Sequence, residues 1–444
     1  MNFGFAKTDI TPRVGVQLYG YGPFLNRHSI AVRDPLFARA MAVSDGETAA
    51  VLVSCDLVGV SADITDAVRE RVAAETDLPG EHVCVHCVHT HSGPRTKTTI
   101  GWGADDPPYL ELLPGKIASA CVAAIQNLQP ATISHAVVPC EGLGYNREDD
   151  VRSDLADCLR EDWRPAKPEL TDTEAHVLRV DADGETLGFA SYFSCHPVVG
   201  PSPSRYIHGD FVGVATNNLE RETPGSVGLF LQGCQGDINS CVVHYAEQES
   251  LLALDVIAGR YARQIRPGIR DASPLSGGEV RVISRECKLT HDPVPEAELR
   301  EMLAEREAIL NAPGASDEDG EVRMATVYAI ALRKELARLR DEVPIDDAFE
   351  IQGLRIGDLL MVGAPFEIMN RYKTRIQEQF DQPVLVMGLC NDARGYAPRR
   401  ESFAKEGNYA ARVVPYLLGY SPFAPSVEDE LVAAMTSVAR ELSA

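Results

Sequence analysis

The chain has 444 residues, of which 45% are hydrophobic and 24% charged, a composition typical of a soluble globular protein with a sizeable core. Acidic residues outnumber basic ones by 65 to 42, and the formal net charge of −23 argues against nucleic acid as a partner. Neither a basic and apolar leader nor an apolar run of about 18 residues occurs. We therefore expect a cytoplasmic protein without a membrane anchor.

The first half of the chain predicts strands that alternate with helices. Residues 38–43 and 49–60 are predicted to form a strand hairpin around the Asp-Gly turn at 45–46, and residues 63–75 have helical spacing. A strand that ends at His89 follows, and then a helix at 109–128 and a strand at 132–138. The hairpin pattern recurs at 173–180 and 186–194, and residues 227–231 form another apolar strand.

The second half contains a change of pattern. Two charged segments around a flexible tip predict a helical hairpin at 293–345, inserted within a single domain that covers residues 1–444. Strands are then predicted at 348–354, 358–362 and 383–389, and an amphipathic helix at 427–442. This order of elements predicts an α/β fold, a layered mixed-sheet domain with flanking helices and the inserted hairpin.

The segment at residues 83–94, Val-Cys-Val-His-Cys-Val-His-Thr-His-Ser-Gly-Pro, is the strongest local signal. Its apolar residues predict a strand, and side chains two apart on a strand, such as His89 and His91, point the same way. The Ser-Gly-Pro end places both at the edge where open α/β sheets bind ligands. Neutral imidazoles held on a strand are a common start of a zinc site, although a turn with two solvated histidines also fits.

Other apolar strands also end in polar groups. These exits carry His196, Asp237, Glu367 and the segment 391–396. Two or three histidines, a carboxylate and an open position for water make up a catalytic zinc site. The remaining histidines are predicted to be surface or packed residues, and the eleven cysteines, including Cys84 and Cys87, to be reduced and packed.

The ordered set of motifs resembles the catalytic N-terminal domain of the neutral ceramidase family, zinc amidases that cleave the N-acyl bond of ceramide. The similar segments span nearly the whole chain and lie at 8–12, 89–94, 145–147, 196–197, 236–237, 365–367 and 395–396, with Tyr409 following. The resemblance implies that zinc is bound by His89, His196, Glu367 and Tyr396. It also implies that His91 and Arg147 line the substrate site.

One position departs from the family pattern. Family ceramidases have an essential serine two residues after the Gly-Asp aspartate, whereas this chain has Asn239 there and Ser240 one place later. The missing serine points away from ceramide. We therefore expect zinc-dependent hydrolysis of an amide (N-acyl) bond in a small soluble substrate, through a zinc-activated water.

Specific roles follow from this hypothesis. Tyr396 or His91 would stabilise the tetrahedral oxyanion, and Asp237 would orient a ligand histidine. Asn239 and Tyr409 would contact the substrate together with Arg147. Several basic residues near these motifs suggest a substrate with a carboxylate or similar anion: Arg95, Lys97, Arg147, Arg205, Arg394, Arg399 and Arg400.

Alternatives remain open from the sequence. A zinc esterase or lactonase would use the same site, and a non-catalytic binding protein of the ceramidase-like fold also fits the pattern. A TIM-barrel amidohydrolase would need eight β/α repeats, which the hairpin-rich order does not supply. The expected partner is a small molecule, and a homo-oligomer is compatible with the composition.

Overall fold

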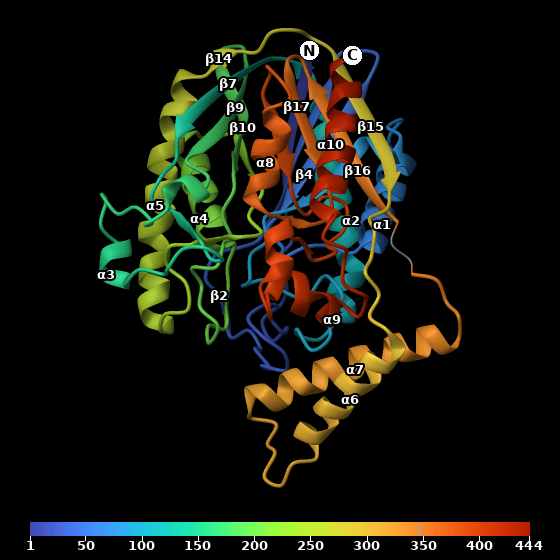
Figure 1. The fold of residues 1–444 in the computed structure, drawn as a ribbon. Helices are drawn as coiled ribbons and strands as arrows, with labels where there is room; N and C mark the ends of the chain where they lie inside the picture. The colour runs from blue at the N-terminus through green and yellow to red at the C-terminus, as the bar shows by residue number, and fades with distance from the viewer. Residues whose placement is uncertain (346–347) are drawn as a thin grey trace.

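Three mixed sheets share one apolar core in the computed structural model, which describes residues 1–345 and 348–444 (Figure 1). The first sheet has the order β5-β4-β3-β1-β6, with β1 (Asn2–Asp9), β3 (Phe37–Ser44), β4 (Ala49–Cys55), β5 (Val83–Cys87) and β6 (Gln129–Pro130). The second is β12-β10-β9-β7-β14, with β7 (Thr132–Pro139), β9 (Glu174–Ala182), β10 (Glu185–Phe193), β12 (Val227–Gln232) and β14 (Ser273–Pro274). The third is β15-β16-β17-β19, with β15 (Val280–Cys287), β16 (Phe349–Ile356), β17 (Leu359–Gly363) and β19 (Val384–Met387).

Helices cover the outer face of each sheet (Figure 1). The first sheet packs on α1 (Ala62–Glu75) and α2 (Pro107–Gln126), the second on α4 (Asp210–Glu222) and α5 (Glu247–Asp271), and the third on α8 (Asn370–Gln377) and α10 (Val427–Ser443). Successive strand residues face alternately the core that the sheets share and the covering helices. Met41 and Leu52 face the shared core, whereas Ala40 and Val53 face α2. Both faces are covered, which explains why these strands are almost entirely apolar.

Each sheet contributes one parallel pair of strands, namely β4 with β5, β10 with β12 and β17 with β19. The carboxyl ends of the three pairs meet. The backbone N–H of Cys87 donates to the carbonyl of Leu389 at 3.2 Å, and that of Gly388 donates to Gln232 at 3.2 Å. Polar residues that follow these strands are therefore brought to one place.

Short elements complete the fold. Two small sheets at the strand exits pair β8 (Gly144–Asn146) with β13 (Ile238–Ser240), and β18 (Glu367–Ile368) with β20 (Tyr396–Ala397). The others are β2 (Ala31–Val32), β11 (Tyr206–Ile207), α3 (Leu155–Cys158) and α9 (Val414–Leu418). Helices α6 (Glu296–Leu310) and α7 (Gly320–Arg340) pack on each other at the lower edge of the view in Figure 1.

The α/β fold with layered mixed sheets and flanking helices is confirmed, and the helical hairpin forms as expected. Its status as an insertion into a single domain stays a prediction. Strands β4, β5 and β19 end two or more residues earlier than predicted, at Cys55, Cys87 and Met387, while β1, β15 and α5 were not anticipated. None of the helices in the described ranges is long and apolar enough to cross a bilayer.

Candidate metal centre

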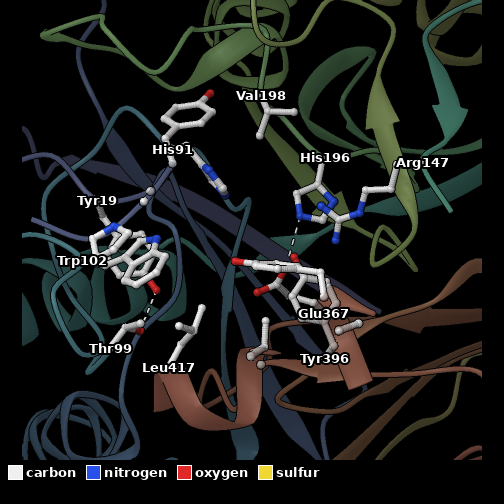
Figure 2. Close-up of a pocket in the computed structure, with 18 of the residues that line it drawn as sticks. Tyr19, His91, Thr99, Trp102, Arg147, His196, Val198, Glu367, Tyr396 and Leu417 are labelled. Carbon is white, nitrogen blue, oxygen red and sulfur yellow. Dashed lines mark hydrogen bonds and ion pairs between the residues drawn. The ribbon is translucent and has the colours of Figure 1, made fainter. Parts of the chain in front are cut away.

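Three histidines and a glutamate converge where the parallel strand pairs end (Figure 2). One nitrogen each of His89, His91 and His196 lies within 4.8 Å of the others. Glu367 Oε2 lies 3.2 Å from Nε2 of both His89 and His196, and Nε2 of His91 lies 3.2 Å from Nε2 of His89. His89, His196 and Glu367 are buried, and His91 is partly exposed. The four groups therefore surround one point.

Backbone carbonyls fix the orientation of two of the imidazoles. His89 Nδ1 lies 2.6 Å from the carbonyl oxygen of Val58, and His196 Nδ1 lies 2.7 Å from that of Gln235. A carbonyl only accepts hydrogen bonds, so each Nδ1 carries a proton and each Nε2 is the nitrogen that faces the cluster. Metal-binding histidines are usually held in this way.

Burial and neighbouring charges favour the metal-binding protonation states. Burial and the Arg147 guanidinium lower the pKa of His196 to about 4, against the effect of Glu367. Burial, with His89 and His196 nearby, holds the pKa of His91 well below its usual range. Burial alone would raise the pKa of Glu367, but the histidines and the Lys97 ammonium outweigh it and hold it well below its usual range. At neutral pH His91 and His196 are therefore neutral imidazoles and Glu367 is a carboxylate.

This donor set fits a divalent cation. Imidazole lone pairs and a carboxylate oxygen that face one another in a buried space are unfavourable without a positive charge between them. Nitrogen and oxygen donors of this kind suit a metal such as zinc, whose catalytic sites use three protein ligands and an open position.

His89 and His91 meet by a route that differs from the predicted strand. Strand β5 ends at Cys87, and His89 has a φ of 77°, so the two side chains are not successive residues on one strand face. His91 instead lies against Gly20, where an added Cβ would be 2.7 Å from Nδ1 of His91. The absence of a side chain at residue 20 therefore gives the imidazole its space.

Tyr396 joins the cluster through the small sheet of β18 and β20. Glu367 and Tyr396 are direct partners in that parallel pair, and the Tyr396 ring stacks on His196 with centroids 6.4 Å apart (Figure 2). The Arg147 guanidinium lies over the Tyr396 ring at 5.1 Å and donates to the carbonyl of Gly236 at 2.6 Å. Burial and Glu367 raise the pKa of Tyr396 well above its usual range despite Arg147, so the phenol keeps its proton.

A cavity of about 680 Å³ opens over the cluster, a size typical of small-molecule sites. The predicted site residues that line it are His89, His91, Arg147, His196, Asn239, Glu367, Tyr396 and Tyr409. Asp237 is not among the lining residues. It accepts from the backbone N–H of Asn370 at 2.7 Å and from Asn146 Nδ2 at 3.0 Å. The expected contact with a ligand histidine is replaced by the Gln235 carbonyl on His196.

The position of the family serine can be followed in β13. Asn239 lines the cavity, and its Oδ1 lies 3.5 Å from Nη1 of Arg147. Ser240 is fully buried, lies outside the lining, and donates its hydroxyl to the carbonyl of Val242 at 2.8 Å. Successive strand residues face opposite ways, so Ser240 does not take the place of the serine.

Loops supply site residues that the strand-exit pattern could not indicate. Lys97 Nζ lies 3.8 Å from Glu367 Oε1 and 5.6 Å from the centre of the Tyr19 ring, and Tyr19 Oη lies 2.7 Å from Thr99 Oγ1 (Figure 2). Trp102 and His244 also line the cavity, although His244 was one of the histidines predicted to be surface or packed residues. The glycine- and tyrosine-rich loop at 19–22 provides part of the wall.

Most of the basic residues expected near an anionic substrate are engaged elsewhere. Arg95 pairs with Asp105 and Arg394 with Asp392, each at 2.8 Å. Arg399 pairs with Glu148 and Asp149, and Arg400 with Asp429. Arg205 is exposed and outside the lining, which leaves Lys97 and Arg147 of the original set in the cavity.

Comparisons with known proteins agree with this geometry. Residues 1–248 match the family model of the neutral/alkaline non-lysosomal ceramidase N-terminal region. The fold is similar to that of a neutral ceramidase from Pseudomonas aeruginosa, with a TM-score of 0.72 and 20% identity over 99% of this chain and 74% of that chain. A ceramidase complexed with C2 gives a TM-score of 0.73 and 20% identity over 99% of this chain and 75% of the other. At this identity the structural likeness concerns the fold.

Proposed function

The chain belongs to the neutral/alkaline ceramidase family, and we propose that it is a zinc-dependent hydrolase that cleaves an amide (N-acyl) bond of a small, anionic substrate. The observation that carries the proposal is the convergence of His89, His196 and Glu367 in one cavity, with Nε2 of both histidines 3.2 Å from the same carboxylate oxygen. Tyr396 completes the proposed ligand set. Zinc held there would lower the pKa of a water molecule to about 7 and polarise the scissile carbonyl.

The protein's own groups would then position the substrate and stabilise charge. The Tyr396 phenol keeps its proton and can donate to the oxyanion that develops on the carbonyl oxygen. Arg147 is fixed by Gly236 and by the Tyr396 ring, so its guanidinium is held in place before the substrate binds. His91 stands beside His89 and would contact the reacting amide.

The charge of the cavity supports an anionic substrate. On a chain with a net charge of −23, the lining contains four basic side chains, those of Lys97, Arg147, Arg323 and Lys405. Its acidic side chains are Glu148 and Glu367, and Glu148 is occupied by Arg399. Tyr19, Trp102 and Leu417 give the opposite wall an apolar surface (Figure 2), suited to an acyl group.

Metal analysis tests the proposal. We expect about one zinc per chain in the purified protein. Little zinc is expected in His89→Ala and Glu367→Ala, because each substitution removes one of the proposed ligands. His135→Ala is the matched control, because His135 pairs with His176 outside the cavity. Circular dichroism checks that every variant folds. Full zinc occupancy in both ligand variants would contradict the assignment.

Activity is then measured as amine release from N-acyl amino acids, with matched esters in parallel. Faster turnover of the amides is the expected result, and turnover of esters alone would refute an amide substrate. Tyr396→Phe separates two roles of this residue. An oxyanion donor predicts a loss of about 10²–10³ in kcat with the zinc retained, whereas a required ligand predicts loss of the metal itself.

A further inference from the structure

The helical hairpin reaches the cavity through the first turn of α7. Gly320, Arg323 and Met324 belong to the lining together with the residues of the candidate metal centre. Figure 1 places α6 and α7 beyond the ends of the sheets, whereas the histidine cluster lies at the strand exits. The cavity lining thus includes residues of both the cluster and the hairpin, and the first turn of α7 contributes Arg323.

The Arg323 guanidinium is held by one nitrogen only. Nη1 donates to the backbone carbonyls of Asp317 and Glu318 at 3.3 and 2.6 Å. Nε is buried and has no hydrogen-bond partner, and Nη2 makes no hydrogen bond to the residues that the structure describes. Nε and Nη2 together form the edge of a guanidinium that binds a carboxylate through two parallel hydrogen bonds.

No carboxylate in the described ranges neutralises this group. The acidic side chains of its own loop, at 317, 318, 319 and 321, are exposed, and none forms an ion pair with Arg323. By contrast, Lys405 at the cavity pairs with Asp149 at 2.7 Å, and Arg333 farther along α7 pairs with Glu307 at 2.7 Å. A buried donor without a partner is costly, so the free edge suits a ligand anion.

We propose that Arg323 is a specificity-determining residue that binds a carboxylate of the substrate at the end remote from the scissile amide. The inference rests on the proposed function for the position of the amide at the histidine cluster. The substrate class is then an N-acyl compound with an apolar acyl chain and a distal carboxylate, and the hairpin is the element that recognises that carboxylate.

Binding measured without turnover tests the proposal. The probes are octanesulfonyl-glutamate and octanesulfonyl-glutamine, two sulfonamides that resist hydrolysis. They differ only at the end of the amino-acid side chain, which is a carboxylate in the first and a neutral amide in the second. Titration calorimetry on the metal-loaded protein is expected to give at least about tenfold tighter binding of the glutamate compound, as for a charge-assisted bidentate contact. Arg323→Gln should abolish this preference. Arg323→Lys should retain part of it, because a lysine keeps the positive charge but cannot donate two parallel hydrogen bonds to the carboxylate.

Arg333→Gln is the control variant, since it removes a guanidinium from the same helix outside the cavity lining and should keep the preference. Equal affinity of the parent for the two probes, binding of neither, or a preference that survives in Arg323→Gln would overturn the proposal. Equal losses for both probes in Arg323→Gln would mean that Arg323 acts structurally or contacts a group that the probes share, such as the α-carboxylate, and would also overturn the proposal. A preference that depends on Arg323, in a protein that hydrolyses no N-acyl amino acid, would uphold this inference and refute the proposed function alone.

Discussion

A buried ion network beneath the candidate site permits a quantitative test of the structure. Arg39 of β3 is 2% exposed and donates from Nη1 to Asp56 at 2.7 Å, from Nη2 to Asn217 at 2.5 Å, and from Nε to Glu220 at 3.2 Å. Asp56 directly follows β4, two residues before Val58, whose carbonyl holds the His89 ring. The network therefore joins helix α4 to the strand end that supports the cluster.

Replacing Arg39 by methionine keeps an unbranched apolar stem and removes the charged guanidinium. Loss of one partner from a buried pair costs about 3–5 kcal/mol. Glu220 keeps Lys7 at 2.6 Å, so only Asp56 loses its cation and retains the N–H of Phe37 at 2.9 Å. We therefore expect the lower end of the range, a loss of about 3 kcal/mol in the free energy of unfolding.

The loss should depend on pH in a defined direction. Burial already raises the pKa of Asp56 from its ordinary value of 3.8, even with Arg39 beside it, and the variant raises it further. A group whose pKa is raised in the folded state contributes stability that is fully present below its unfolded pKa and is lost as the pH rises through its folded pKa. The cost of Arg39→Met should therefore be small at pH values below about 4 and grow as the pH rises towards neutrality.

Equilibrium unfolding in urea at acidic and neutral pH measures the loss. Arg263→Met is the matched control, because Arg263 pairs with Glu161 at 2.6 Å with 49% and 71% of the two side chains exposed. Such exposed pairs contribute about 0–1 kcal/mol. An Arg39→Met variant that loses no more stability than this control at neutral pH would refute the reasoning.

Three further predictions concern the site and the core. Gly20→Ala places a Cβ 2.7 Å from Nδ1 of His91, so it should reduce hydrolysis while zinc analysis shows that the metal is retained. Gly46→Ala is the control, because Gly46 has a φ of 100°, close to the 103° of Gly20, and no neighbour within 4 Å of the added Cβ; it should leave hydrolysis unchanged. Burial lowers the pKa of His86 from 6.5 to about 4. This shift corresponds to roughly 3 kcal/mol of stability that is present at neutral pH and is lost as the pH falls from about 6.5 to 4. Urea unfolding of His86→Gln should therefore show a smaller loss of stability over this interval. A chelator should lower the Tm of the parent protein in a thermal scan and leave that of His89→Ala unchanged, because metal binding stabilises only a chain that holds the metal.

Local sequence pattern was sufficient for most of the architecture because both faces of the strands are covered. Strands such as β4 and β17 are continuous apolar runs that turn signals delimit, and the helices that cover them have regular apolar spacing. Residues that follow such strands meet because the carboxyl ends of the parallel pairs in the three sheets come together. His89, His196 and Glu367 were found in this way, although they are far apart in the chain.

The sequence contained no comparable signal for the backbone conformation at His89 or for the hydrogen-bond partner of His196. A positive φ at His89 is unusual for a residue other than glycine, and the strand pattern around it gave no indication that β5 ends at Cys87. The partner of His196 is a backbone carbonyl, which any residue at 235 would supply, so the sequence favoured the nearby Asp237 instead. Arg323 belongs to a helix that joins the cavity only through the tertiary arrangement.

The nature of the nucleophile is where sequence and structure combine. The sequence places an asparagine where family ceramidases have their serine, and the structure gives that asparagine a role: Asn239 Oδ1 lies beside Arg147, and β13 turns Ser240 into the interior. A side-chain amide is not a nucleophile at neutral pH, and the Ser240 hydroxyl donates a hydrogen bond to the carbonyl of Val242. Neither residue can supply the attacking oxygen, so a water molecule is the expected nucleophile whatever the substrate. In the proposed mechanism only the metal would activate that water at neutral pH.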